Sequence, residues 1–512
     1  MIAGYDASSS RAAFFAAYEH ANGALVWRTL AGDLETPVSA LIKLGPENAG
    51  TFLLESVQGG AFRGRYSIIG CRPDLVWRVR EGRAEEGRRF GSFRIRGEPL
   101  ESLRKLIKRS SLVIPQGLPP MAAGLFGYLG YDMVRFMERL PAKTSDPLGT
   151  PDAMLVRPTI VAIFDNVTGE TTLVTPAWKR EGKSAAQAYE QAQKRLDRAE
   201  RDLRRPLPRA TAPEAPSGPF PATTSNTTPG EYRTLVEKCK AYTRAGDIFQ
   251  VVPSQRFSAP FTLPAFALYR SLRRLNPSPF LYYLNFGDFQ VVGSSPEILV
   301  RKRGDTITIR PIAGTKPRGA TPAEDHANEV ELLADPKERA EHLMLVDLAR
   351  NDLGRVARRG GGSSDNVAAA GAGSKHVRVT ESFVIERYSH VMHIVSNVEG
   401  ELREGLTALD ALIAGFPHGT VSGAPKIRAM EIINEVEPHK RGIYAGGVGY
   451  FGAGGDMDTC IALRTGIVKD GVLSVQAGGG VVLDSDPEIE LQETLHKSRA
   501  LFRAASEAWR YA

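Results

Sequence analysis

Two pairs of glutamates, each following an Asp-Pro dipeptide, have a spacing that could serve chemistry. Asp335-Pro336 and Asp486-Pro487 predict helix starts, because aspartate caps free N–H groups and proline suits the first helical position. Each predicted helix then carries two glutamates three residues apart: Glu338 and Glu341, and Glu490 and Glu493. Residues at this spacing share a helix face, so two such faces brought together would form a cluster of four carboxylates. Carboxylate oxygens are hard ligands of the kind that Mg2+ prefers.

The glutamate pairs also have an ordinary structural interpretation. Glu338 stands three residues after Asp335, the position at which a capping box uses a glutamate to bind the helix start. Glutamates on solvated helix faces are common as well. The spacing alone therefore leaves both a metal site and a solvated surface open.

A histidine in a strand-like segment is the next candidate. His393 lies in segment 388–396, where strand alternation would point its side chain away from that of His390. The two histidines therefore cannot ligate one metal together. His393 is either a buried structural residue or a general acid or base that acts near neutral pH.

An arginine and a glycine run point to an anion. Arg464 lies in the apolar predicted strand 457–468, where a guanidinium needs a carboxylate from the protein or from a substrate. Gly478, Gly479 and Gly480 permit close backbone approach to an anion, although turns use glycine too. These residues predict a Mg2+ enzyme that acts on a small acidic substrate, and they do not identify that substrate.

The elements that must position these residues predict an α+β fold. Beyond residue 230, probable strands follow one another through glycine turns, without regular alternation of strand and helix. They span 290–302, 306–312, 377–400, 443–452, 457–468 and 472–484. This pattern favours antiparallel sheets with helices on the outside.

The composition divides the chain at residues 206–229, where prolines fall among serine, threonine and alanine. This stretch predicts a linker rather than a packed element. We expect an N-terminal domain over 1–205 and a catalytic domain over 230–512. The segment 360–374, rich in glycine and serine, predicts a surface loop.

Bulk properties exclude several classes of protein. The chain has 512 residues, 42% of them hydrophobic, which is enough for a large core. Its formal net charge of +7 is small for this length, and the arginines form no basic stripe interleaved with aromatic residues. We therefore expect no nucleic-acid partner. No apolar stretch is long enough to cross a membrane, and no secretory signal is evident. Three widely spaced cysteines indicate a reducing cytoplasm.

The chain also carries an ordered set of motifs that resembles one enzyme family. They are 246–252 (GDIFQVV), 276–279 (NPSP), 294–297 (SSPE), 311–315 (PIAGT), 341–352 (EHLMLVDLARND), 418–426 (HGTVSGAPK) and 458–460 (DTC). Together they resemble the chorismate-utilising enzymes, most closely anthranilate synthase component I. The resemblance implies that family's α+β fold, in which antiparallel sheets pack as a sandwich with helices outside.

The resemblance assigns metal and substrate roles. Glu341 and Glu493 match the inner Mg2+ ligands, with Glu338 and Glu490 beside them, and the metal would bind the ring carboxylate of chorismate. The enolpyruvyl carboxylate would meet a second group of residues: Tyr444, Arg464 and the backbone at Gly478, Gly479 and Gly480. Residues matched to the ring and its chemistry are Thr315, Thr420, His393, Gln250 and Lys497, with His393 assisting departure of the 4-hydroxyl.

Two positions separate the chain from relatives of the same family. Aminodeoxychorismate synthases commonly carry a lysine where this chain has Ala313, and isochorismate and salicylate synthases carry a lysine base where it has Gln250. Both differences point to external ammonia as the nucleophile and to anthranilate as the product. An aminodeoxychorismate synthase-like enzyme and a catalytically inactive tryptophan sensor remain the alternatives.

The resemblance further implies feedback inhibition by tryptophan. The matched residues are Glu55, Ser56, Asn276, Pro277, Ser278, Pro279, Leu281, Tyr450 and Cys460. The tryptophan ammonium would pair with Glu55. Cys460 lies four residues from Arg464 on the same predicted strand, so a ligand near Cys460 would bias the residue that holds substrate.

A partner subunit is also implied. None of the three cysteines lies in a Gly-x-Cys-x-Gly nucleophile elbow, so the chain carries no recognisable glutamine amidotransferase. The resemblance implies a separate small subunit that supplies ammonia from glutamine, assembled with this chain in a hetero-oligomer. The reaction would be the first committed step of tryptophan biosynthesis.

Overall fold

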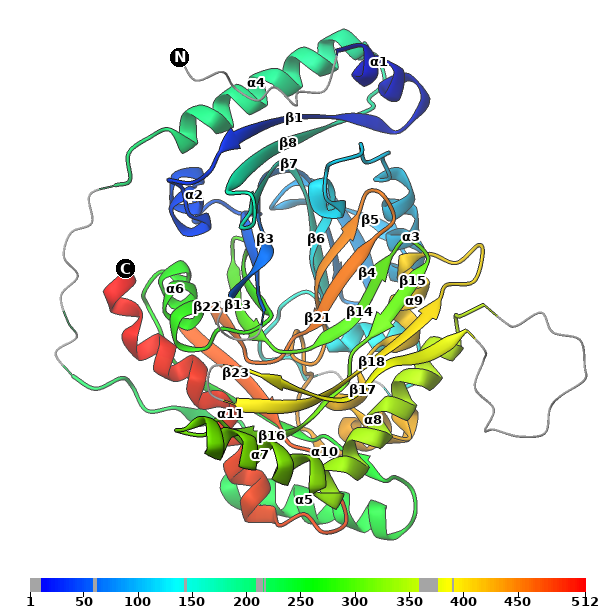
Figure 1. Cartoon of the computed structure of the whole chain (residues 1–512), viewed down its shortest axis with the longest axis vertical. Helices are drawn as coiled ribbons and strands as arrows, with labels where there is room; N and C mark the ends of the chain where they lie inside the picture. The colour runs from blue at the N-terminus through cyan, green and yellow to red at the C-terminus, as the bar shows by residue number, and fades with distance from the viewer. Residues whose placement is uncertain are drawn as a thin grey trace, which may run out of the picture.

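The computed structural model describes residues 11–58, 62–141, 145–208, 215, 218–358, 376–388 and 391–512 (Figure 1). His390 and the predicted loop 360–374 lie outside these residues. The described strands pair antiparallel throughout, and helices lie on the outside of the sheets, which confirms the α+β fold.

Two long strands are shared by two sheets. β3 (Phe62–Arg80) pairs with β7 (Ala153–Asp165) from Tyr66 opposite Asp165 to Val79 opposite Ala153. The register shifts between Pro73 and Leu75, because proline cannot donate to the ladder. One end of the β3–β7 pair therefore belongs to the first sheet and the other end to the second.

The first sheet runs in the spatial order β1, β8, β7, β3, β2, β12, β13, β22, β23, β11, β9. Its other strands are β1 (Gly23–Ala31), β8 (Glu170–Trp178), β2 (Phe52–Gln58), β12 (Phe280–Asn285), β13 (Phe289–Ser295), β22 (Thr465–Lys469), β23 (Val472–Gly478), β11 (Ser254–Pro260) and β9 (Thr224–Ser225).

The second sheet runs in the order β5, β4, β3, β7, β6, β20, β21, β14, β15, β18, β17, with β16 also on β18. Its other strands are β5 (Ser92–Gly97), β4 (Arg83–Arg89), β6 (Gly124–Leu129), β20 (Gly447–Gly452), β21 (Met457–Ile461), β14 (Ile298–Arg303), β15 (Thr306–Ile309), β18 (Val391–Glu401), β17 (Val377–Arg387) and β16 (Ile312–Pro317). A separate short pair joins β10 (Gln250–Val251) to β19 (Gly423–Ala424).

The core is layered as helix, sheet, sheet, helix. Phe52, Tyr128, Tyr282 and Val448 belong to the buried cluster between the two sheets. The first sheet is covered by α1 (Arg11–His20), α2 (Pro37–Leu44), α4 (Ala185–Leu203), α6 (Ala265–Leu275) and α11 (Pro487–Glu507). The second packs against α3 (Pro99–Arg109), α5 (Pro229–Arg244), α7 (Pro322–Ala334), α8 (Pro336–Gly354), α9 (Ala408–Gly415) and α10 (Lys426–Val436).

Four details differ from the sequence expectations. The predicted strand 377–400 is two strands, β17 and β18, which pair antiparallel with each other. The predicted strand 457–468 is two strands, β21 and β22, which lie in different sheets, because the chain turns at Arg464 with φ +47°. The predicted strand 290–302 is likewise broken, at Pro296. The end of the predicted linker forms β9, which pairs with β11.

The boundary at 206–229 does not separate the two sheets. β2 pairs with β12, and β6 pairs with β20, so strands from before and after this segment lie side by side in both sheets. No helix in the described part of the chain is long and apolar enough to cross a membrane.

Candidate active site and a second pocket

The two predicted helix starts exist and bring the glutamates together. Asp335 accepts hydrogen bonds from Lys337 N and Glu338 N at the start of α8, and Asp486 does the same at the start of α11. Glu338 completes no capping box, because Asp335 N donates to Glu331 O instead. The Glu338 carboxylate lies beside Gly314, where a Cβ would stand 3.1 Å from Oε2.

Mutual repulsion and burial mark these carboxylates as a group. Burial raises the pKa of Glu338, and the neighbouring charges of Glu341 and Glu493 raise it further. Burial raises the pKa of Glu490 to about 7, with Glu493 adding to the shift. Its Oε2 is buried and has no hydrogen-bond partner in the described structure. A cation placed among these carboxylates would offset both their mutual repulsion and the free energy lost when they are buried.

The carboxylates do not converge on one point. In the described residues, no three Asp, Glu, His or Cys side chains stand close enough to hold a metal ion together. Glu341 Oε1 accepts instead from Gln250 Nε2 at 3.2 Å, and Glu493 forms an ion pair with Lys497 at 2.6 Å. A metal at this site would have to draw Glu493 away from Lys497.

The glycine run connects three parts of the site. A Cβ at Gly478 would lie 2.9 Å from the Tyr444 hydroxyl, and one at Gly479 would lie 2.8 Å from Glu490 Oε2. A Cβ at Gly480 would lie 2.2 Å from Gln250 Nε2. At each glycine a different functional group lies close to the backbone. A side chain at any of the three positions would clash with that group.

A cavity of about 140 Å³ opens on the other side of this glycine strand. Residues expected from the sequence that line it are Thr315, His393, Thr420, Tyr444, Arg464, Gly478 and Lys497. Ala313 lines it too, so the cavity wall carries a methyl group at this position.

Arg464 is a cation without an anion. It lines the cavity, burial lowers its pKa, and no carboxylate among the described residues forms an ion pair with it. Its backbone φ of +47° is a conformation that L-residues rarely adopt, so the turn holds the guanidinium in place at some cost in strain. An anionic ligand is the missing partner.

His393 is held as a neutral hydrogen-bond acceptor. Its Nδ1 lies 2.9 Å from Gly314 O, and because a carbonyl only accepts, Nδ1 must carry the proton. Burial, together with the nearby charge of Arg464, lowers its pKa to about 4. At neutral pH Nε2 is therefore unprotonated, and the part in departure of the 4-hydroxyl that the resemblance implies for His393 stays a prediction.

Glu297 is a cavity residue that the sequence reasoning did not select. Burial raises its pKa to about 8, so the carboxyl is protonated at neutral pH. Thr420 Oγ1 donates to Glu297 Oε1 at 3.0 Å, and Ile312 N donates to the same oxygen at 3.3 Å, which places the proton on Oε2. Only burial distinguishes Glu297, and no local pattern around the SSPE motif indicates that its glutamate is enclosed.

Comparison with known proteins agrees with this geometry. Residues 63–503 match the family described as chorismate binding enzyme. The chain belongs to the chorismate-binding enzyme family. It is 57% identical over 495 residues to anthranilate synthase component 1 of Cereibacter sphaeroides, covering 95% of both chains. It is 48% identical to the protein of the same name from Pseudomonas putida, covering 94% of this chain and 95% of that one.

Solved structures show the same fold. Anthranilate synthase component I from Streptococcus pneumoniae superposes with a TM-score of 0.75 at 37% identity, covering 86% of this chain and 92% of that one. The menaquinone-specific isochorismate synthase of Escherichia coli superposes with a TM-score of 0.69 at 19% identity, covering 95% of each chain. The second likeness shows the fold alone.

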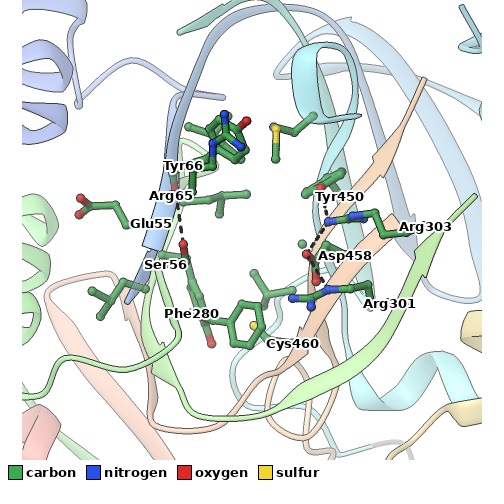
Figure 2. Close-up of a pocket in the computed structure, with 17 residues that line it drawn as sticks. Glu55, Ser56, Arg65, Tyr66, Phe280, Arg301, Arg303, Tyr450, Asp458 and Cys460 are labelled. Atoms are coloured by element: carbon green, nitrogen blue, oxygen red, sulfur yellow. Dashed lines mark hydrogen bonds and ion pairs between the residues drawn. The ribbon is translucent and has the colours of Figure 1, made fainter. Parts of the chain in front are cut away.

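A second pocket of this chorismate-binding enzyme, of about 250 Å³, lies between the sheets (Figure 2). Five of the residues expected to bind tryptophan line it: Glu55, Ser56, Leu281, Tyr450 and Cys460. Leu54, Ile68, Met121 and Phe280 make much of the wall apolar. Arg301, Arg303 and Asp458 occupy one side, where both arginines bind Asp458, as Figure 2 shows.

The Glu55 carboxylate does not face this pocket. It points away from the pocket in Figure 2 and binds Arg273 at 2.6 Å and the Tyr269 hydroxyl. Side chains alternate along β2, so Leu54 and Ser56 turn toward the pocket while Glu55 turns to the opposite face. Asp458 Oδ1, which is buried and accepts no hydrogen bond from the described residues, is the free carboxylate oxygen here.

The NPSP motif spans two other cavities. Asn276, Pro277 and Ser278 line a cavity together with His393 and Arg464, on the active-site side. Pro279 lines a polar groove that continues to Ser56 and Phe280 of the second pocket. The structure therefore separates the first three residues of the motif from the other residues expected to bind tryptophan.

Proposed function

We propose that this chain is the large component of an anthranilate synthase, which converts chorismate and ammonia to anthranilate and pyruvate. The observation that carries the proposal is a small cavity with an unpaired arginine, Arg464, and a neutral buried acid, Glu297. A dianionic substrate needs a cation such as Arg464 to bind a carboxylate. A poor leaving group needs an acid such as Glu297 to protonate it. The names of the relatives, at up to 57% identity over nearly the whole chain, supply the substrate and product.

Binding would rest on charge. Arg464 and the Tyr444 hydroxyl, beside Gly478, receive the enolpyruvyl carboxylate, because an unpaired buried guanidinium gains most from a bidentate acid. Lys497 donates to Gly478 O at 3.0 Å and lies at the edge of the same cavity.

The leaving group requires a proton. Ammonia attacks C2 of the ring while the C4 hydroxyl departs, and hydroxide is a poor leaving group without an acid. Glu297, protonated at neutral pH, would donate that proton, so the hydroxyl leaves as water. His393 Nε2, a neutral acceptor, would orient the hydroxyl rather than protonate it. Loss of pyruvate and of the C2 proton then gives the aromatic ring.

Mg2+ is the proposed metal. Glu338, Glu341, Glu490 and Glu493 provide hard oxygen donors, and burial together with the charge of Glu493 raises the pKa values of Glu338 and Glu490. When bound, Mg2+ would neutralise the ring carboxylate that otherwise repels a nucleophile.

Ammonia is proposed as the nucleophile because the cavity offers no amine of its own where Ala313 stands. This position disfavours an aminodeoxychorismate synthase-like reaction. A small glutamine amidotransferase subunit would supply the ammonia within a hetero-oligomer, since all three cysteines are buried and unpaired and none can act as its nucleophile. Thiols of this kind suit the cytoplasm, which is the proposed location.

Tryptophan is the proposed occupant of the second pocket. The apolar wall suits an indole, and Asp458 Oδ1 is the acceptor that an amino-acid ammonium would meet in place of Glu55. Tryptophan would inhibit the enzyme from this pocket.

The test is product analysis of the purified chain with chorismate, Mg2+ and ammonium. Anthranilate and pyruvate, detected by fluorescence and mass, are the expected products. Formation of aminodeoxychorismate or isochorismate would contradict the conclusion, drawn from Ala313 and Gln250, that the product is anthranilate. Tryptophan binding without turnover would favour an inactive sensor.

A further inference from the structure

Arg441 is a charged residue enclosed behind the wall of the active-site cavity. It is only 2% exposed, and it is not among the described residues that line the cavity. Arginine is almost never fully buried unless its charge is paired. The role of Arg441 therefore depends on what its guanidinium contacts.

The guanidinium is held from three directions. Nη2 and Nε donate to the Glu437 carboxylate at 2.6 Å and 3.0 Å. Nη1 donates to Val421 O at 2.7 Å, and Nη2 donates to Val252 O at 2.5 Å. Val421 directly follows Thr420, and both line the cavity. Because the guanidinium is a rigid plane, these contacts fix both its position and its orientation.

Two tyrosine rings lie next to this cation. Arg441 Cζ is 4.8 Å from the ring centroid of Tyr131 and 5.5 Å from that of Tyr444. A cation at such distances is attracted to the ring. Tyr444 lines the cavity, and Tyr131 is not among the described residues that do. The charge of Arg441 therefore reaches the cavity through the Tyr444 ring.

The same charge acts on the Tyr444 hydroxyl. Burial raises the pKa of this hydroxyl to about 12, and the charge of Arg441 opposes that rise more strongly than the charge of Glu437 adds to it. A cation that makes a hydroxyl more acidic also makes it a stronger hydrogen-bond donor. Without Arg441, the hydroxyl would be a weaker donor on a ring that is held less firmly.

We propose that Arg441 is a positioning residue for the substrate, which fixes the Tyr444 ring and strengthens the hydrogen bond from its hydroxyl to the enolpyruvyl carboxylate. The inference rests on the proposed function, which places that carboxylate at Tyr444 and Arg464. Arg441 itself does not touch the substrate. The hydrogen bond forms when the substrate binds, before any bond of the ring breaks. Its loss therefore raises KM for chorismate more than it lowers kcat.

The first test compares Arg441→Met with a matched control, Arg428→Met on α10. Arg428 forms an ion pair with Glu431 at 2.9 Å and lies 5.2 Å from the Tyr242 ring centroid, but it is not among the described residues that line the cavity. In Arg441→Met we expect KM for chorismate to rise about tenfold and kcat to fall by no more than about threefold. Arg441→Lys, which keeps the charge, should recover part of the KM. The control should match the parent enzyme.

A double-mutant cycle decides whether Arg441 acts through Tyr444. In a Tyr444→Phe background, Arg441→Met should raise KM by less than about twofold, because no hydroxyl remains to be strengthened. A further rise as large as in the parent would overturn the proposal and leave Arg441 as a support for the backbone at Val252 and Val421. A fall in kcat at unchanged KM would overturn it as well.

A second variant and a second measurement keep the test decisive. Arg441→Gln removes the charge but keeps amide donors, and it takes the place of the methionine variant if that one does not fold. Calorimetry with chorismate and Mg2+, without ammonia, gives the dissociation constant of each variant independently of turnover. Failure of the parent chain to form anthranilate would reject the proposed function, whereas the dissociation constants would still decide the role of Arg441.

Discussion

The active site and the second pocket differ in whether their charged side chains have ion-pair partners within the protein. Arg464 of the cavity has no ion-pair partner among the described residues. Beside the glycine run next to the cavity, Glu490 Oε2 and Gln250 Oε1 have no hydrogen-bond partner among those residues. In the second pocket, Arg301 and Arg303 both bind Asp458, and Glu55 is bound by Arg273. The first site suits the charged substrate and the metal that we propose for it, whereas the second suits the mainly apolar ligand with one ammonium that we propose there.

The two sites are connected by a short chain segment. Asn276 belongs to the active-site side, and Phe280 and Tyr282 line the second pocket. Ser294 donates from Oγ to Asn276 O at 2.5 Å and from N to Arg464 O at 3.2 Å. A ligand that displaces Phe280 would therefore act on Arg464 through backbone contacts rather than along one strand.

Metal removal should give the largest difference between the two sites, because it should stop turnover and leave tryptophan binding unchanged. Chelation with EDTA is expected to abolish anthranilate formation, because the repelling ring carboxylate is then no longer neutralised. Tryptophan affinity, measured by calorimetry, should stay unchanged, since no glutamate of the cluster lines the second pocket. Full turnover in the chelated enzyme would contradict the metal assignment.

Glu297→Gln should lower kcat by about 10²–10⁴-fold, the usual contribution of a positioned general acid. The pKa of Glu297 is raised to about 8, so the acid form persists below that pH and is lost above it. In the parent enzyme kcat should therefore fall as pH rises through about 8, measured at saturating NH3. The variant should lack this alkaline fall; if it keeps the fall, another group is the acid.

Arg464→Met should cost about 2–5 kcal/mol in kcat/KM for chorismate, because a buried charged partner of the substrate is removed. Steady-state kinetics would show most of the loss in KM. Arg464→Lys keeps the charge without the planar fork and should recover part of it. Tryptophan affinity is the control readout, and a parallel loss there would mean that the turn itself had collapsed.

Ser56→Phe should have the smallest effect on turnover. Ser56 lines the second pocket, and a phenyl ring there would fill the space proposed for the indole. Tryptophan inhibition should disappear, while kcat/KM for chorismate stays within about twofold. Inhibition that survives would place the tryptophan site elsewhere.

Local sequence patterns predicted the positioning elements well. The Asp-Pro signals at Asp335 and Asp486 gave the correct starts of α8 and α11, because caps depend only on neighbouring residues. The continuous strand through Arg464 was wrong, because an apolar run does not reveal that its two halves pair in different sheets.

The sequence alone determined the α+β class, the helix starts and the family, since these rest on local spacing and on ordered motifs. Only the tertiary structure decided which groups are enclosed and which remain unpartnered. Burial gave Glu297 its raised pKa and His393 its lowered one, and β2 alternation turned Glu55 away from its expected ligand. Desolvation and facing direction depend on residues hundreds of positions apart, which no local pattern records.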